Sequence, residues 1–412
     1  MSGPLDPGAL RQDFPLLTRT VHDRPIVYLD SSATALTPRP VLEAMDHYYE
    51  TTHSNVHRGV YRTAEEATGL YEGARLGVGR FIGARDPANE VVFTKNTTEA
   101  LNLLAHSWGR TNLAPGDVVV LTELEHHANI VPWLQLADER HIVLRYLPVD
   151  GAGRLDLSHL DQVLDGAKLV SVSAMSNVLG TAPPVAAIAA AAHDAGALIA
   201  VDGAQSVPHF PVDVAGLGVD FLAFSAHKML GPTGIGVLWG RAELLADMPP
   251  FLGGGGMILD VRTDRFLPAD PPRRFEAGTP PIAEAVGLGA AVDYLSGVGM
   301  DRVRAHELAL TRYALDALDA RFGSSCRVFG PPAGPDRGGV LSLALGDIHA
   351  HDLAQVLDQF GVCVRPGHHC AKPLMRKLGV SATARASFGL YNDESDVDVL
   401  IEGMVEAGKL FG

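Results

Sequence analysis

The chain has 412 residues, more than the roughly 250 to 300 at which a single hydrophobic core stops growing, so we expect two domains. Its 48 acidic side chains outnumber its 33 basic ones, which gives a formal net charge of −15 at pH 7. This charge repels phosphate backbones and anionic lipids, and it argues against nucleic acids and membrane surfaces as partners.

The sequence shows neither a targeting signal nor a cysteine pair. The opening residues, MSGPLDPGAL, lack the basic and apolar regions of a secretory signal, and the longest apolar stretch is interrupted by His193, Asp194 and Gly196. We therefore expect a cytoplasmic protein. The three cysteines form no C-x-x-C pair, which argues against a disulfide framework and against a cysteine zinc cluster.

Apolar runs of strand length recur through the first two thirds of the chain, mostly separated by helical patterns such as 184–195. The runs lie at 91–94, 118–122, 169–174, 197–201, 219–224 and 235–239. Continuous apolar strands that alternate with helices predict an α/β fold with a mainly parallel sheet covered on both faces.

The pattern changes in the C-terminal part of the chain. It predicts a long helix at 300–321, short strands near 339–345 and 361–365, and a closing helix at 393–410. These elements indicate a smaller α+β domain, which the N-terminal segment could join. The preceding stretch 250–281 is rich in Gly, Pro and charge and too long for an ordinary connection, so it is either a functional loop or an intersubunit arm.

Two strand ends carry residues that a core strand does not need. Asp202 follows the apolar run ALIAV, and Lys228 follows another core strand in SAHKMLGPTG. A carboxylate at the carboxyl end of a buried strand needs a partner, and ligands of open α/β sheets bind at that edge. A lysine alone is a weak signal, but with this carboxylate it suits pyridoxal phosphate, which needs a Schiff-base lysine and an acid on its pyridine nitrogen.

A phosphate site is expected where a helix begins. Thr97 and Thr98 lead into an apolar helix, whose free N–H groups and dipole favour an anion. Ser225 and His227 add donors beside the lysine, so one phosphate could account for four polar residues. The alternative is an ordinary N-cap with Glu99 in the first turn.

Several long motifs extend this pattern along almost the whole chain: YLDSSATALTP, HRGVY, TEALNLLAHSWG, EHHANIVPW, SNVLGT, VDGAQSVPH, SAHKMLGPTGIG, RFEAGTP, RPGHHCAKPLM and ARASFGLYN. In these motifs the sequence resembles the class V aminotransferase family of pyridoxal phosphate enzymes of fold type I. Within that family it looks like the SufS-type (group II) cysteine desulfurases and selenocysteine lyases. The resemblance implies a large domain, 24–295, with a mainly parallel seven-stranded sheet, and a smaller α+β domain from 1–23 and 296–412.

The resemblance also implies roles for particular residues. Lys228 would form the Schiff base, Asp202 would pair with the pyridine nitrogen, Gln205 would bond the ring hydroxyl, and His126 would stack on the ring and shuttle protons. Further positions would bind the phosphate or the substrate. These are Thr97, Thr98, Ser225 and His227 for the phosphate, Thr279 for the phosphate of the other subunit of a homodimer, Asn177 near the ring hydroxyl and substrate, and Arg385 for the substrate carboxylate.

The sequence around each of the three cysteines indicates in part which one is reactive, independently of the family resemblance. Cys363 lies between two valines and Cys326 has no basic cluster beyond Arg327, so both are expected to be structural. Cys370 follows RPGHH, a setting that favours a thiolate. A zinc site of His368, His369 and Cys370 with His349 or His351 is the alternative, but adjacent histidines on one strand point to opposite faces.

The resulting prediction is a desulfurase that converts L-cysteine to L-alanine and leaves a persulfide on Cys370, for iron–sulfur cluster assembly. The alternatives are a selenocysteine lyase, another pyridoxal phosphate enzyme of class V, or a non-catalytic zinc-binding scaffold. The segment HAHD at 349–352 resembles the version of the family whose acceptor is a SufU-type zinc protein rather than a SufE-type one. In that version His351 would replace a ligand of the partner's zinc.

Overall fold

The computed structural model describes residues 3–411. Its centre is a seven-stranded sheet in the order β4-β10-β9-β8-β7-β5-β6, in which only β10 runs antiparallel to its neighbours. The strands are β4 (Val91–Thr94), β5 (Val118–Thr122), β6 (Val143–Leu147), β7 (Ala167–Ser173), β8 (Leu198–Asp202), β9 (Phe221–Ser225) and β10 (Gly236–Gly240). The predicted mainly parallel, seven-stranded α/β sheet is confirmed.

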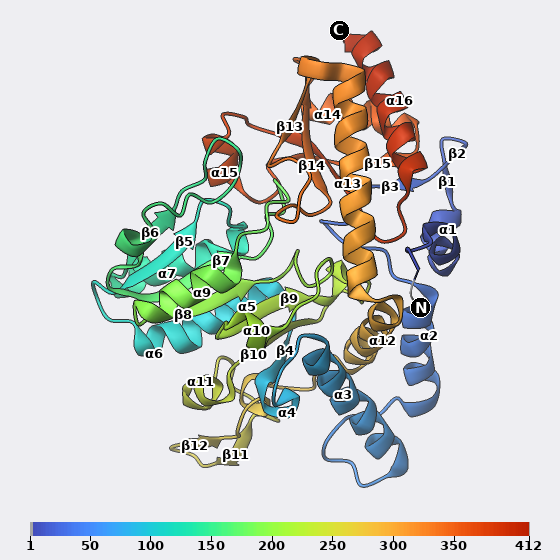
Figure 1. Ribbon diagram of the computed structural model, residues 1–412. Helices are drawn as coiled ribbons and strands as arrows, with labels where there is room; N and C mark the ends of the chain where they lie inside the picture. Colours follow the sequence, from blue (N-terminus) through green and yellow to red (C-terminus); the bar gives the residue numbers. More distant parts are fainter. Residues whose placement is uncertain (1–2, 412) are drawn as a thin grey trace.

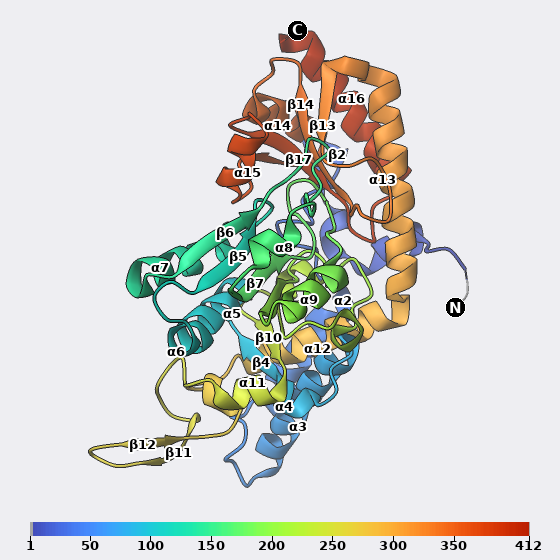
Figure 2. The same cartoon turned by 60° about the vertical axis from the view of Figure 1, so that its left-hand side comes forward.

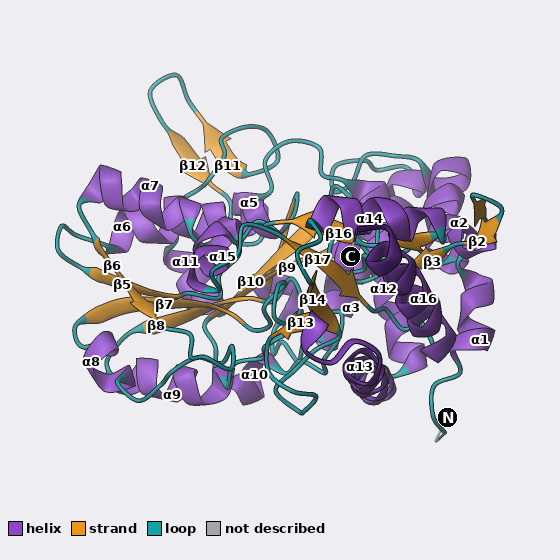
Figure 3. Ribbon diagram, turned by 90° about the horizontal axis from the view of Figure 1, so that it is seen from above, coloured by secondary structure: helices purple, strands orange, loops and turns teal. Residues whose placement is uncertain are grey.

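Helices cover both faces of this sheet, as Figure 3 shows from above. Alternate strand residues face two separate apolar layers: Val170 and Ile199 pack into one, Leu169 and Ala200 into the other. The first layer includes α3 (Arg62–Phe81), α9 (Val185–Asp194) and α12 (Ile282–Val298); the second includes α5 (Thr97–Leu104), α7 (Val131–Arg140) and α11 (Ala242–Asp247). Burial on both faces explains why these strands read as continuous apolar runs.

A smaller α+β unit stands above the sheet in Figure 1. It has an antiparallel sheet in the order β13-β14-β17-β16, formed by β13 (Cys326–Phe329), β14 (Val340–Leu345), β17 (Thr383–Ser387) and β16 (Arg365–Gly367). Its helices are α13 (Met300–Phe322), α14 (Ala350–Gln359), α15 (Lys372–Lys377) and α16 (Glu394–Phe411). Gly299, at φ +91°, separates α12 from α13, and α13 rises from the large sheet into this unit.

The N-terminal segment joins the smaller unit. Strand β3 (Val27–Tyr28) pairs in parallel with β15 (Val362–Cys363), and Asp30 bridges to Ser387. This pairing extends beyond residue 23, where we expected the segment to end. The remaining N-terminal elements are α1 (Pro7–Leu10), β1 (Thr20–Val21), β2 (Arg24–Pro25) and α2 (Arg39–His47).

The stretch 250–281 contains a hairpin that projects from the body of the molecule (Figure 2). Its strands are β11 (Ile258–Val261) and β12 (Phe266–Pro268), and the exposed side chains include Leu259, Val261, Phe266 and Leu267. The remaining α-helices are the short α4 (Pro87–Glu90), α6 (Arg110–Asn112), α8 (Leu160–Leu164) and α10 (Val214–Leu217). Over residues 3–411, every helix is too short or too polar to cross a lipid bilayer.

Candidate active site

The polar residues predicted from the sequence gather at the carboxyl edge of the large sheet. Asp202 and Ser225 end β8 and β9, Lys228 lies in the turn after β9, and His126 follows β5. They line a cavity of about 210 Å³ that the smaller unit completes with Arg385 and others. The remaining predicted residues in its wall are Thr97, Thr98, Asn177, Gln205, His227 and Cys370.

Asp202 and Lys228 face the same space without pairing directly. Asp202 is 5% exposed as a residue, and its carboxylate accepts a hydrogen bond from the Ala204 amide at 2.9 Å. Burial raises the pKa of Asp202. The hydrogen bond from the Ala204 amide and the charge of Lys228 each lower this pKa, but by less than burial raises it. Burial lowers the pKa of Lys228 to about 8, although the negative charge of Asp202 acts to raise it. A buried acid with room beside it is suited to a cationic ligand nitrogen.

The start of α5 lies at the cavity. Asn96 is the N-cap, and its side chain accepts a hydrogen bond from the Glu99 amide. Thr98, in the first turn, lines the cavity. The hydroxyls of Thr97 and Ser225 lie 2.6 Å apart, which joins the helix start to the end of β9. The ordinary N-cap is therefore present at Asn96, and Thr97 and Thr98 in the first turn still line the cavity, where helix N–H groups favour an anion.

His126 is held at the cavity by its own turn. Its Nδ1 accepts from the Ala128 amide at 3.0 Å, and burial, assisted by the Lys228 charge, lowers the pKa of His126 to about 3. Its neighbour Glu125, which no sequence pattern singled out, is fully buried, and burial raises the pKa of Glu125 to about 7. The Glu125 carboxylate accepts hydrogen bonds from Thr122, Asn129 and Ser173, and so ties the end of β5 to the end of β7.

Four buried polar atoms of residues that line the cavity have no hydrogen-bond partner among the described residues. They are Gln205 Oε1, Ser32 Oγ, His369 Nδ1 and Arg385 Nε. The Gln205 amide is oriented by donation to the Ser32 carbonyl at 2.7 Å. Arg385 donates to the Asn177 carbonyl at 3.0 Å and to Asp30 at 3.1 Å, which fixes its guanidinium. Buried atoms of this kind normally have hydrogen-bond partners, and a polar ligand in the cavity would supply them.

Cys370 reaches the cavity on a strained loop after β16. His369 and Cys370 have φ of 51° and 54°, a left-handed conformation that costs a non-glycine residue of order 1–3 kcal/mol. The Nε2 atom of His369 lies 2.8 Å from Thr383 Oγ1, and the His369 carbonyl accepts from the Asn177 amide at 2.7 Å. Asn177 therefore lines the cavity but directs its amide to the cysteine loop.

The other two cysteines lie in strands outside the cavity wall. Burial raises the pKa of Cys326 to about 11, and burial together with nearby carboxylates raises the pKa of Cys363. Both are thus kept as thiols. Among residues 3–411, no three His, Cys, Asp or Glu side chains are grouped so that they could hold a metal ion.

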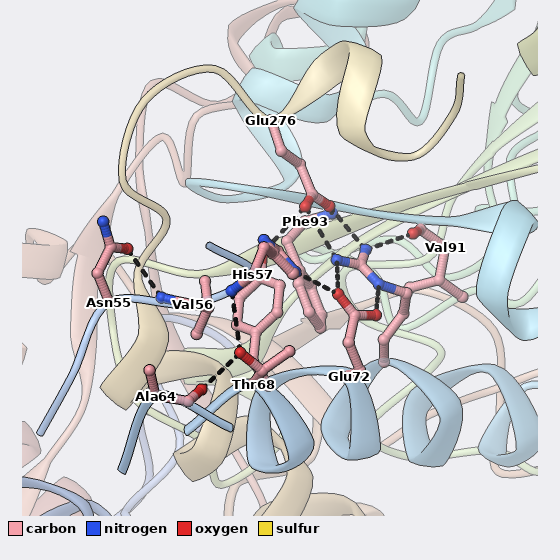
Figure 4. A network of polar contacts seen from close by, with 11 residues as sticks. Asn55, Val56, His57, Ala64, Thr68, Glu72, Val91, Phe93 and Glu276 are labelled. Carbon is pink, nitrogen blue, oxygen red and sulfur yellow. Dashed lines mark hydrogen bonds and ion pairs between the residues drawn. The ribbon is translucent and has the colours of Figure 1, made fainter. Parts of the chain in front are cut away.

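Thr279 and His351 lie outside this cavity. Thr279 follows Glu276, which Figure 4 shows above Glu72 and His57. The Glu276 carboxylate accepts two hydrogen bonds from the buried Arg75, at 2.7 and 2.9 Å, and others from Tyr71 and the Phe93 amide. This network anchors the loop that carries Thr279 to α3 and β4.

Comparison with known proteins agrees with this architecture. Residues 27–400 match the family model described as Aminotransferase class-V. A probable cysteine desulfurase of Streptomyces coelicolor is 50% identical and a cysteine desulfurase of Haloferax volcanii 49% identical, each aligned over 100% of this chain and 99% of its own. The apo structure of the cysteine desulfurase from Thermococcus onnurineus NA1 superposes with a TM-score of 0.94 at 42% identity over the full length of both chains.

The Escherichia coli cysteine desulfurase CsdA has a TM-score of 0.91 at 39% identity, over 99% of this chain and 100% of its own. The family model covers most of the chain, and the relatives match it end to end. The chain therefore belongs to the class V aminotransferase family, among its cysteine desulfurases.

Proposed function

We propose that this chain converts L-cysteine to L-alanine with the sulfur held as a persulfide on Cys370, and that it supplies this sulfur for iron–sulfur cluster assembly. The observation that carries the proposal is that Cys370, Lys228 and Arg385, from three separate segments, line one cavity. Among the described residues all three cysteines are free. A persulfide relay needs such a reduced thiol, which fits the cytoplasm as its compartment.

The residues present fit pyridoxal phosphate. Asp202 would pair with the pyridine nitrogen, and the unpartnered Gln205 Oε1 faces the same cavity. The start of α5, with Ser225 and His227, would hold the phosphate, and Lys228 would bind the aldehyde carbon. When bound, this cofactor supplies an electron sink for the substrate α-carbon.

The protein side chains would then perform the remaining tasks. Arg385, whose Nε is free, would bind the substrate carboxylate, a role that suits a planar guanidinium. Lys228, with its pKa lowered to about 8, retains a fraction of neutral amine near neutral pH and would take the α-proton. His126 stays neutral at that pH and is suited to pass a proton at the cavity wall.

The sulfur step is a transfer between two thiols. The Cys370 thiolate attacks the substrate sulfur, an S–S bond forms, and the substrate Cβ–S bond breaks. The electron pair of that bond stays on Cβ, which takes up a proton, so the products are alanine and the Cys370 persulfide. No external oxidant or reductant is consumed.

The test compares Cys370→Ser with Cys363→Ser in the purified protein given cysteine. We expect Cys370→Ser to bind cofactor normally but to lose alanine production and persulfide, measured by amino-acid analysis and mass spectrometry. The Cys363→Ser control should retain both. The opposite result would assign the nucleophile to Cys363, and selenocysteine breakdown that greatly exceeds cysteine turnover would favour the lyase alternative.

A homodimer is part of this proposal. Thr279 lies outside the cavity of its own chain, while the nearby hairpin exposes Leu259, Val261 and Phe266 to solvent. Apolar side chains on a projecting hairpin favour an interface. We therefore assign Thr279 to the phosphate site of the partner subunit.

The acceptor is proposed to be a SufU-type zinc protein. His351 is exposed in the first turn of α14, and its ring stacks on that of His349 at 5.4 Å. His349 caps the helix, since its Nδ1 accepts from the His351 amide. Helix α14 packs against β16, which leads to Cys370. Two imidazoles at this surface are suitable ligands for a partner's zinc.

We expect His351→Ala to form the Cys370 persulfide normally and to lose stimulation by a SufU-like acceptor. The control is His159→Ala, which removes an exposed histidine of the large domain. Alanine production per enzyme, measured with and without the acceptor, decides the point. Equal stimulation of both variants would contradict the ligand exchange, and stimulation by a SufE-like acceptor alone would assign the other type.

A further inference from the structure

The second histidine of EHHAN has no role in the chemistry described above, yet it contacts the cysteine loop twice. The main-chain N–H of His127 donates to the Cys370 carbonyl at 2.8 Å. The Lys372 amide donates to Nε2 of the His127 ring at 3.0 Å. The two hydrogen bonds therefore hold the loop at Cys370 and again two residues later.

These contacts join parts of the molecule that are far apart in sequence. His127 begins the turn after β5, directly beside His126 at the cavity, whereas Cys370 and Lys372 lie between β16 and α15 of the smaller unit. Within the loop itself, the Cys370 amide donates to Nδ1 of His368. The left-handed conformation of His369 and Cys370 is thus held by this contact within the loop and by the His127 contacts from outside it.

The imidazole must be unprotonated at Nε2 to accept from an amide. Partial burial lowers the pKa of His127, and the neighbouring His368 and Lys372 act in the same direction. The ring therefore stays neutral near neutral pH, which keeps the Lys372 contact. The contact is at the surface, so it opens more readily than a buried one.

We propose that His127 is a positioning residue that latches the loop 368–372 over the cavity, so that Cys370 faces the substrate sulfur. Opening of this latch frees the loop to carry the sulfur outward. This role rests on the proposed function of Cys370 as the sulfur acceptor. In this role the His127 hydrogen bonds would hold the strained loop in place until substrate binds.

Three variants of the 412-residue chain separate the role of the His127 ring from that of the His127 main chain and from the charge of Lys372. His127→Ala removes the Nε2 acceptor and keeps the main-chain N–H. His127→Gln retains an acceptor near the same position on a chain of similar length. Lys372→Ala is the control for charge, because it removes the ammonium group and keeps the amide that makes the contact.

The first measurements need no turnover. Hydrogen–deuterium exchange of the peptide that contains Lys372, and the rate at which iodoacetamide alkylates Cys370, report loop opening directly. The loss of one exposed hydrogen bond should raise both by about three- to tenfold in His127→Ala. His127→Gln and Lys372→Ala should remain close to wild type, and cofactor absorbance should be unchanged in all three variants.

The last measurement is single-turnover persulfide formation on Cys370, which should slow in His127→Ala and recover in His127→Gln. Unchanged exchange in His127→Ala, or a glutamine variant as open as the alanine variant, would overturn the latch. Faster exchange with unchanged persulfide formation would also overturn the positioning role. If the loop opens as expected but Cys370→Ser still produces alanine, the proposed function fails and the latch contact stands.

Discussion

At the scale of single residues, burial sets the charge states at the cavity. It lowers the pKa of Lys228 to about 8 and that of His126 to about 3, and it raises that of Asp202. The lysine can therefore act as a base, and the histidine stays neutral. A cationic partner would stabilise the charged form of the Asp202 carboxyl group. These are the states that the proposed chemistry requires, and they come from position in the fold rather than from residue type.

Another buried histidine of the cavity wall, His369, predicts how stability depends on pH. Burial lowers the pKa of His369 to about 3, whereas an unfolded histidine titrates near 6.5. Between these values the unfolded chain binds more protons, so the free energy of unfolding falls as the pH falls. We expect urea unfolding of the cofactor-free protein to show lower stability at pH 5 than at pH 7.

The variant His369→Gln removes this group and keeps a side chain that can reach Thr383. Its stability should therefore fall less between pH 7 and pH 5 than that of the wild type. Replacing the exposed His159 in the same way is the control and should leave the slope unchanged. Equal slopes in all three proteins would show that His369 does not titrate differently on unfolding.

At the scale of elements, charged side chains connect α3 to the loop before α12. Arg75 is fully buried on α3 and pairs with Glu276 in that loop and with Glu72 one turn away on its own helix. Burial opposes the charge of Arg75, but the two carboxylates and Tyr71 outweigh it and raise its pKa. His57 closes the network by a contact of 2.8 Å with Glu72. The position of Thr279 depends on this anchor.

Removal of one partner from this buried pair should be costly. We expect Glu276→Gln to lower the free energy of unfolding by about 3 kcal/mol, because Arg75 keeps its charge and loses its main partner. The control Glu66→Gln breaks an exposed pair with Arg62 on the same helix and should change stability by less than about 0.5 kcal/mol. Urea denaturation measures both, and equal effects would contradict the importance of burial.

At the scale of the whole molecule, the cavity is assembled from separate units. Lys228 and Asp202 come from the large sheet, whereas Cys370 and Arg385 come from the smaller unit. The hydrogen bonds of His127 and Asn177 to the cysteine loop cross between them. The proposed dimer adds a third contribution, because Thr279 lies outside its own cavity.

Mixed dimers test this last contribution. In a dimer of one Lys228→Ala chain and one Thr279→Ala chain, the second chain keeps its lysine and would receive the partner's Thr279. We expect such a dimer, isolated with two affinity tags and assayed at limiting cofactor, to have about half of the wild-type activity. A dimer of wild type with Lys228→Ala calibrates that value. Activity no higher than that of the Thr279→Ala homodimer would show that Thr279 acts within its own chain.

The sequence by itself determined the parts of this protein that depend on local pattern. Apolar runs predicted β7, β8 and β9 to within a few residues, because strands buried on both faces are apolar throughout. The helices at 300–321 and 393–410 appear as α13 and α16 for similar reasons of periodicity. Asp202 and Lys228 could be paired in advance because carboxyl ends of parallel strands meet at one edge.

Tertiary structure decided what depends on contacts between distant segments. The strand β6 was not predicted, because it lies at the sheet edge and is partly exposed, which breaks the apolar run. The left-handed Cys370 and the buried Glu276 network have no local signal. Each is stabilised by residues that are remote in sequence, such as His127 and Arg75. A pattern along the chain predicts which side chains are buried, but which buried side chains contact one another depends on the tertiary structure.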